Sequence, residues 1–457
     1  MDGSSEQLEI ESLCQLFGRI LDQAQLEVTQ AKLGLQRNRS VFTPAVVVWL
    51  MIFQRLHPNH TLSRAVAELK SGRLDHLMDE CKRSREGNIS GNTGAYSQAR
   101  EHLPQEVALA AATCIFEHFC PPADEQLLFH GYRIFAVDGT NLHVPDTPEL
   151  LAAFPPGSNQ YCQSTRPIVQ LDVAHDLVTG TAVVPVWGAK NGPNRTSEQG
   201  LLIELLPNLP AQSVIVGDRN FGIFAVVHAL TQHHNPVVVR LTIDRVKRLL
   251  GHEPQPGISR DVDWTASAHD RRSHPEFTSS TSVKGRVIVH YFQQEETGKV
   301  IPLYLFTTLD LPDELIVELY RRRWFLETDL CMLKSTVNMH ELTATKVDLV
   351  EKEIILGIAA YNLVRSIITF AAQRLNLNPR CISFSRALEA IEANALNLFY
   401  ETDSEKLYKF LDDFKYYKLY RAKHKPSEPR SVKPQKRKYP ILMVPRKVAR
   451  NNLKSKN

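Results

Sequence analysis

Apolar residues recur at helical spacing in the first part of the chain. Three segments show this periodicity, at 45–56, 62–70 and 106–119. Thr43 and Pro44 precede the first of them, and these residue types favour the N-cap and the first position of a helix. A polar stretch rich in Gly, Asn and Ser separates the other two at 84–94. The pattern predicts a helical N-terminal domain over 1–122.

After Gly131 the apolar pattern changes to short β-branched runs separated by turn residues. Five strands are predicted, at 132–137, 167–174, 180–188, 213–217 and 236–242. Helical segments at 197–209 and 221–234 follow the third and fourth strands. This order predicts a mixed five-stranded sheet covered by helices, an α/β fold of the ribonuclease H-like (retroviral integrase-like) kind. Residues 123–244 are its predicted first part.

The rest of the chain predicts four further parts. Residues 245–305 are polar and then strand-like, which indicates a β-rich insertion subdomain. Helical periodicity returns in a second part of the core at 306–375, followed by a helical C-terminal region at 376–425 and a basic tail at 426–457. Polar side chains interrupt the apolar segment at 353–375, so a core helix is predicted there and no membrane contact is expected.

Charge is unevenly distributed along the chain. The formal net charge is +4, yet the tail at 426–457 holds ten Lys and Arg and one acid, so the remainder is net acidic. Such a segment, with Lys436, Arg437 and Lys438 at its centre, is typical of an arm that binds nucleic-acid phosphates. A solubilising tail is the alternative.

Composition excludes several classes of protein. With 43% hydrophobic and 23% charged residues, the chain does not fit collagen-like, disordered or membrane-embedded proteins. Its acidic N-terminus lacks the order of a secretory signal, which favours the cytoplasm. The seven cysteines are scattered and without metal-site spacing, so neither a disulfide scaffold nor a structural zinc site is predicted.

Two aspartates each follow a predicted strand. Asp138 ends the first strand and Asp218 ends the fourth. Taken singly, each fits an ordinary turn, because Asp before Gly or in a turn is common. On neighbouring strands of one sheet, however, the two carboxylates would project from the same edge.

Four polar side chains share one face of the helix predicted at 320–334. Tyr320, Arg323, Glu327 and Lys334 fall within a sector of roughly 60° at helical spacing. A solvated face with an Arg/Glu pair is the alternative. Asp138, Asp218 and Glu327 together would supply hard oxygen ligands for two divalent ions, Mg²⁺ or Mn²⁺, that act on a phosphodiester. Arg323 and Lys334 would then hold phosphates beside the ions.

The pattern Y-x(2)-R-x(3)-E-x(6)-K at 320–334, with DGT at 138–140 and DRNF at 218–221, resembles the DDE transposases of bacterial insertion sequences, specifically the IS-four family. The resemblance implies a cut-and-paste enzyme whose catalytic and metal-binding residues are Asp138, Asp218 and Glu327. It also implies DNA contacts by the side chains around this centre, Arg219, Tyr320, Arg323 and Lys334. Asn220 departs from the Gly or Glu often found in the second motif.

The same resemblance implies the partners. These are double-stranded DNA, as terminal inverted repeats bound by the N-terminal domain and as target DNA, and further copies of the chain in a homodimer or higher oligomer. In relatives, an aromatic side chain of the insertion stacks on a flipped base, and Trp264 is the candidate here. The alternative is a Trp that anchors a small β core.

Two other functions stay open on the sequence alone: a metal-dependent nuclease on the same fold without strand transfer, and a transposase-derived DNA-binding protein that does not cut. Four more residues draw attention but lack partners at suitable spacing: His143, His233, His234 and Cys331. We expect surface or capping roles for the histidines and a buried packing role for Cys331.

Overall fold

The structure, a computed structural model, describes residues 40–57, 60–72, 74–119, 128–157, 166–293, 298, 300–398 and 404–419, with five further positions between 444 and 452. The first 39 residues of the predicted N-terminal domain lie outside this set, as do Lys436, Arg437 and Lys438.

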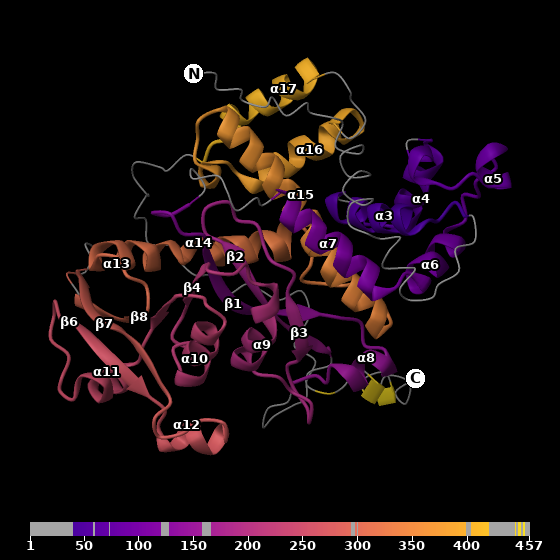
Figure 1. Ribbon diagram of the computed structural model, residues 1–457. Helices are drawn as coiled ribbons and strands as arrows, with labels where there is room; N and C mark the ends of the chain where they lie inside the picture. The colour runs from indigo at the N-terminus through magenta and orange to yellow at the C-terminus, as the bar shows by residue number, and fades with distance from the viewer. Residues whose placement is uncertain are drawn as a thin grey trace.

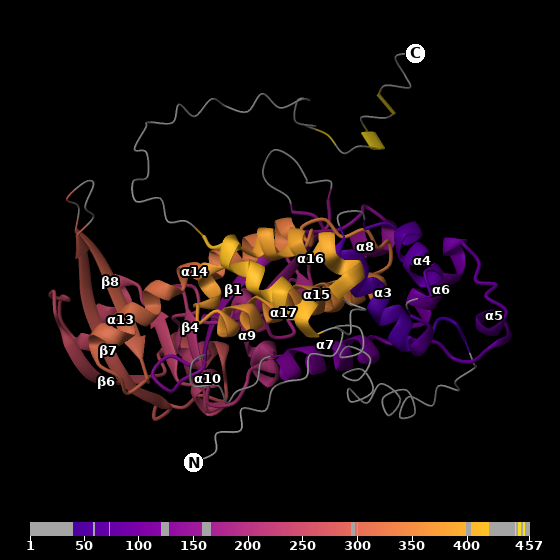
Figure 2. The same ribbon diagram turned by 90° about the horizontal axis from the view of Figure 1, so that it is seen from above.

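The N-terminal part is helical. Its helices are α3 (Pro44–Leu56), α4 (Leu62–Lys70), α5 (Lys82–Arg85), α6 (Thr93–His102) and α7 (Gln105–Phe119). The predicted start of the first helix is confirmed, because the Thr43 hydroxyl accepts a hydrogen bond from the Val46 amide at 3.2 Å and Pro44 is the first helical residue. Figure 2 shows α3 to α6 at the end of the molecule opposite strands β6 to β8.

One eight-stranded sheet runs from the middle of the molecule to the end that holds β6 to β8 (Figure 1). Its strands are β1 (Ile134–His143), β2 (Ile168–Asp176), β3 (Val186–Ala189), β4 (Val214–Gly217), β5 (Val237–Arg240), β6 (Ser259–Thr265), β7 (Ser282–Gln293) and β8 (Val300–Thr307). In space they run in the order β3-β2-β1-β4-β5-β8-β7-β6. β1, β3, β4 and β5 run in the same direction, and β2 is antiparallel to them.

The predicted alternation of strands and helices is confirmed for this region, with α9 (Glu198–Leu205) before β4 and α10 (Phe224–Gln232) before β5. The third strand is shorter than the predicted 180–188. Its first half pairs with β2 only at an isolated bridge between Ala182 and His175. The amide and the carbonyl of Ala182 both bond the Asn362 side chain, each at 2.8 Å. The strands of the predicted insertion, β6 to β8, continue the same sheet through an antiparallel pairing of β5 with β8.

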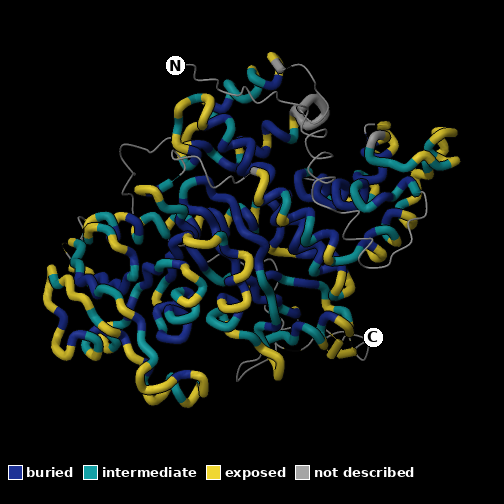
Figure 3. The backbone as a smooth tube through the Cα atoms, in the orientation of Figure 1, coloured by how far each residue is buried: buried dark blue, intermediate teal, exposed yellow. Residues whose placement is uncertain are grey.

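Over β1, β2, β4 and β5 each face of the sheet is buried under helices, whereas the edge strand β6 is largely exposed (Figure 3). On one face, alternate β1 residues such as Ile134 and Ala136 join a core with α15 (Val347–Arg374), α3 and α7. On the other, Phe135 and Val137 join a core with α9, α10 and α11 (Ile243–Leu250). The N-terminal helices therefore share a continuous core with the sheet.

The helix α15 is the central buried element of the molecule. It is long and apolar enough to cross a membrane, yet 94% of its most apolar window is buried inside the protein. Polar side chains within it also bond other elements, as Asn362 does. This is the core helix that the sequence predicts.

The signature segment is not one helix, and the prediction of a single helix over 320–334 is wrong. α13 (Asp313–Arg322) ends before Arg323, α14 (Trp324–Cys331) begins after it, and Met332–Thr336 form a π-helical turn. The break is a tightened turn, because the amides of Arg323 and Leu326 bond carbonyls three residues earlier. The remaining helices are α8 (Pro148–Ala153), α12 (Ala268–Ser273), α16 (Phe384–Leu398) and α17 (Ser404–Asp412).

Candidate active site at the β1 and β4 edge

Asp138 and Asp218 lie beside each other at one edge of the sheet. β1 pairs with β4 in parallel, with Ala136 opposite Val216, so Asp138 and Asp218 stand at the same level just beyond the pairing. β4 ends at Gly217, and the chain turns at Asp218, whose carboxylate accepts the Asn220 amide at 2.7 Å. The two acids interact electrostatically.

Asp138 is held in an environment that favours its neutral form. Burial, the negative charge of Asp218 and that of Glu198 raise its pKa to about 6, against the opposing effects of the Gly139 amide and Arg323. The Gly139 amide donates to Asp138 Oδ1 at 2.8 Å. A carboxylate in such a position gains from a cation, because a cation restores the charged form.

Arg323 joins the third acid to this edge. Its guanidinium lies 3.7 Å from Asp138 Oδ2 and 3.3 Å from Glu327 Oε1. α14 packs on β1, and the Glu327 side chain remains 43% exposed. The structure therefore brings Asp138, Asp218 and Glu327 to one place, with Arg323 between the first and the last.

Tyr320 belongs to the same cluster. Burial raises the pKa of its phenol, while Arg323 and Arg240 lower it and Asp218 raises it further. These partners show that the phenol faces the aspartate edge of the sheet. Arg219, next to Asp218 in the turn after β4, is exposed.

Lys334 follows Glu327 by seven residues. It sits in the π-helical turn, where its carbonyl accepts the His340 amide at 3.2 Å. Its charge acts on His143 at the far end of β1, five residues and about 16 Å along the strand from Asp138. The break at Arg323 and the π turn interrupt the helical spacing that predicts a common face for the four residues.

Trp264 is not available for base stacking in this structure. It is 5% exposed and lies in the core under α10 and α11, with Phe306 and Phe224 at ring distances of 5.0 and 6.0 Å. Trp264 therefore has the alternative role considered above, that of a tryptophan that anchors a β core. Trp324 instead is the exposed indole near the site, with 67% of its surface accessible directly after Arg323.

The remaining candidates are peripheral. His233 ends α10 and bonds the Asn235 side chain at 2.7 Å, which is a capping role. Cys331 is exposed, so the predicted packing role is wrong. The buried positions of α14 are Leu326, Asp329 and Leu330, and Cys331 lies off that face.

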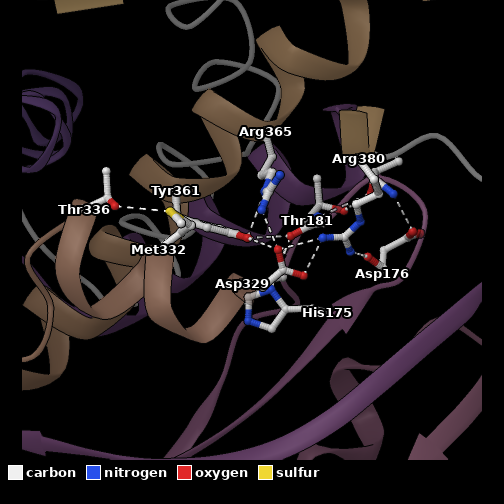
Figure 4. A network of polar contacts seen from close by, with 12 residues as sticks. His175, Asp176, Thr181, Asp329, Met332, Thr336, Tyr361, Arg365 and Arg380 are labelled. Atoms are coloured by element: carbon white, nitrogen blue, oxygen red, sulfur yellow. Dashed lines mark hydrogen bonds and ion pairs between the residues drawn. The ribbon is translucent and has the colours of Figure 1, made fainter. Parts of the chain in front are cut away.

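A buried ionic network, which the sequence analysis missed, anchors α14 (Figure 4). Asp329, two residues after Glu327, is fully buried between Arg365 of α15 and Arg380, and Arg380 Nη1 lies 2.7 Å from both of its oxygens. Arg380 also bonds the carbonyls of Asp176 and Leu177 at the end of β2. The network thus ties the helix that carries Glu327 to the sheet that carries Asp138.

Two more acids near Asp138 were also missed. Asp172 lies on β2 opposite Gly139, and Glu198 is the first residue of α9. The sequence did contain a signal for Asp172, because an aspartate within the apolar run at 167–174 is unusual. Asp is rarely fully buried without a partner.

Comparison with known proteins identifies the class to which this fold and this cluster of acids belong. Residues 129–363 match the family described as the Transposase DDE domain, and this is half of the chain, so the chain belongs to that family. The match contains Asp138, Asp218 and Glu327 and ends within α15.

A particular relative is the transposase InsG of insertion sequence element IS4 from Escherichia coli (strain K12). The two chains are 24% identical over 310 residues, which cover 64% of this chain and 65% of the relative. The predicted relationship to IS-four transposases is confirmed by these two comparisons.

Proposed function

We propose that this protein is a cut-and-paste DNA transposase of an insertion sequence. It would bind the terminal inverted repeats of its element, hydrolyse phosphodiesters at the ends and join the freed 3′-hydroxyls to target DNA, in the cytoplasm at the nucleoid. The observation that carries this proposal is the meeting of Asp138, Asp218 and Glu327 at one edge of the sheet in a chain of the DDE family.

The ribonuclease H-like core would be formed by β1 to β5, whose order in the sheet is β3-β2-β1-β4-β5 with β2 antiparallel to the other four. The helical N-terminal domain would bind the element ends. The insertion, 245–305, would extend the sheet on the other side. Synapsis of two ends would require a homodimer or a higher oligomer.

The residues fit a divalent metal centre by the chemistry of their donors. Carboxylate oxygens are the ligands that Mg²⁺ and Mn²⁺ prefer, and the raised pKa of Asp138 indicates a carboxylate short of positive charge. Among the described residues, three such side chains do not yet converge as a ready ligand set, since Arg323 separates Asp138 from Glu327. Asp138, Asp218 and Glu327 would hold the ions, two in number. When bound, the ions would stabilise charge on the attacking and leaving oxygens.

The chain's own cations would position the DNA. Arg323 would exchange its carboxylate partners for a phosphate of the scissile strand, for which a guanidinium fork is suited. Tyr320, Arg219 and Lys334 would contact neighbouring phosphates, and the exposed indole of Trp324 offers a stacking face to a base. The first reaction adds water to phosphorus and breaks its bond to the 3′-oxygen. The 3′-hydroxyl so formed then attacks a target phosphodiester and displaces another 3′-oxygen.

The test is incubation of the purified protein with DNA that carries the ends flanking its gene, a target plasmid and Mg²⁺ or Mn²⁺. We expect metal-dependent nicks at the ends and products in which ends are joined to the plasmid. Nicks without joined products would indicate a nuclease. Specific binding without any nick would indicate a DNA-binding descendant.

Nicking should depend on pH through Asp138. Because its folded pKa is about 6, protons and metal ions compete for this carboxylate below that pH. We expect nicking at limiting Mg²⁺ to rise with pH through about 6, and saturating Mg²⁺ to move the rise to lower pH. A rise at the same pH at every metal concentration would contradict the assignment.

The same shift has a consequence for folding. The raised pKa means that the folded state binds a proton more tightly than the unfolded chain, so Asp138 makes stability fall as pH rises from about 4 to about 6. Asp138→Asn should therefore unfold at a higher temperature than the wild type at pH 7 without metal.

The basic tail is proposed to be a phosphate-binding arm. Deletion of 426–457 should weaken DNA binding and flatten the dependence of log Kd on log salt, because each lost phosphate contact removes a slope of about 0.9. Equal slopes for the full and shortened chains, measured by fluorescence anisotropy, would show that the tail is only solubilising.

A further inference from the structure

A buried carboxylate on β2, opposite the residue after Asp138, has no hydrogen-bond partner among the described residues. Asp172, in the middle of β2, is 2% exposed, and neither of its oxygens has a hydrogen-bond partner among the described residues. An ionised carboxylate in such a place is costly unless a cation or hydrogen-bond donors compensate it. The position therefore calls for a compensating ligand.

A second carboxyl group faces the same space. A Cβ atom placed on Gly139 would lie 2.7 Å from Cγ of Glu198 and 2.9 Å from Oδ1 of Asp172. Both acids thus converge over the backbone of Gly139, and the missing side chain of this glycine makes the room for them.

This pair lies on the opposite face of the sheet from Arg323. Asp138 pairs with Val173, which belongs to the core under α15, whereas Gly139 pairs with Asp172 on the face covered by α9. Successive side chains of a strand point to opposite faces. Asp172 and Glu198 are consequently separated from Arg323 and Glu327 by the backbone of β1.

Among the described residues, one cation, Lys190, acts on this pair, and it compensates the pair only in part. Lys190 lies 3.8 Å from Glu198 Oε1 with 37% of its side chain exposed, and the Asn220 amide group donates to Glu198 Oε2. Both contacts are to Glu198, and neither gives the oxygens of Asp172 a hydrogen bond. Burial and the charges of Glu198 and Asp138 raise the pKa of Asp172 to about 8, against the effect of Lys190.

We propose that Asp172 and Glu198 hold a divalent cation, Mg²⁺ or Mn²⁺, on the α9 face of β1, separate from the ions proposed for Asp138, Asp218 and Glu327. Mg²⁺ in proteins commonly takes one or two carboxylates and completes its shell with water. Two side chains therefore suffice, even though no set of three ligands converges among the described residues. A cation here also adds positive charge behind Asp138.

The test is the number of Mn²⁺ ions bound per full-length chain, measured without DNA by electron paramagnetic resonance titration. We expect Asp172→Asn and Glu198→Gln each to bind one ion fewer than the wild type. Glu204→Gln is the matched control, because Glu204 is an exposed acid on the same helix, and it should bind as many ions as the wild type. Glu198→Gln also keeps the test decisive if Asp172→Asn does not fold, since Glu198 is partly exposed.

An unchanged ion count in folded Asp172→Asn and Glu198→Gln would overturn the proposal and indicate two carboxyl groups that share a proton. The ion count is measured without DNA, so it does not depend on whether the protein catalyses transposition. Glu327→Gln measured in the same titration tests the other centre, so loss of an ion in one set of variants and not in the other shows which of the two assignments fails.

Discussion

Glu327→Gln should abolish nicking while leaving the binding of element ends intact. The substitution removes one carboxylate ligand from the proposed metal centre and keeps the size of the side chain and the surrounding basic residues. We expect the nicking rate to fall by more than about 100-fold. Loss of a residue that only hydrogen-bonds to a metal ligand already lowers metal affinity or activity by about 10- to 100-fold, and Glu327 would be a ligand itself. Nicking assays and gel-shift measurements on the same DNA give the two readouts.

Glu318→Gln is the matched control for this substitution. Glu318 pairs with Arg322 four residues later, as Glu327 pairs with Arg323 four residues earlier. Among the described residues no second acid pairs with Arg322, whereas Arg323 also pairs with Asp138. Loss of the Glu318 carboxylate should change nicking little, since exposed ion pairs of this kind contribute under about 1 kcal/mol. Equal nicking by Glu327→Gln and the wild type would remove Glu327 from the centre.

Asp329→Asn should destabilise the protein strongly and slow nicking as well. The variant leaves Arg365 and Arg380 buried without their shared carboxylate, and breaking a buried pair in this way costs about 3–5 kcal/mol. Burial alone would raise the pKa of Asp329, but Arg380 and Arg365 hold it below its usual value. The stabilisation is therefore complete at neutral pH and is lost only when the pH falls through that lowered pKa.

Glu353→Gln is the control that distinguishes the positioning of α14 from the stability of the whole protein. Glu353 is likewise buried between two arginines, Arg55 at 3.1 Å and Arg100 at 3.0 Å, but it joins α15 to the N-terminal helices and not to α14. Both variants should lose comparable stability in urea denaturation. Only Asp329→Asn should also raise the Mg²⁺ concentration needed for half-maximal nicking at a temperature where both are folded. An equal shift in both variants would mean that the Asp329 network gives stability alone.

Much of the fold could be predicted from the local sequence pattern, because the starts of helices and the runs of strand residues depend on neighbouring residues. Thr43 and Pro44 start α3 as expected, and the β-branched runs became β1, β2, β4 and β5 in the predicted order. The third strand was overestimated because its pairing with β2 is interrupted between the Ala182 bridge and Val186, where Pro185 lies. Apolar β-branched residues on both sides of this gap give the segment the pattern of one strand.

The positions of site residues could be predicted where a sequence motif and the strand order agree. They could not be predicted where the packing of distant elements determines the position of the side chain. Asp138 and Asp218 could be placed together because parallel neighbouring strands end at one edge. Lys334 could not be placed from helical spacing, since the turn at Arg323 and the π turn interrupt that spacing. Trp264 could not be judged from composition, because its burial depends on Phe224 and Phe306 from other elements. Asp329 and Arg365 appear in the sequence only as polar residues in apolar helices, and their pairing emerges once α14 and α15 pack together.

The most direct measurement is anomalous scattering from Mn²⁺ in crystals of the protein bound to DNA that carries its element ends. The account predicts manganese peaks within ligand distance of the carboxylates of Asp138, Asp218 and Glu327, beside the scissile phosphate. Manganese bound at the cleavage position by other side chains, with Glu327 turned away from both aspartates, would contradict it.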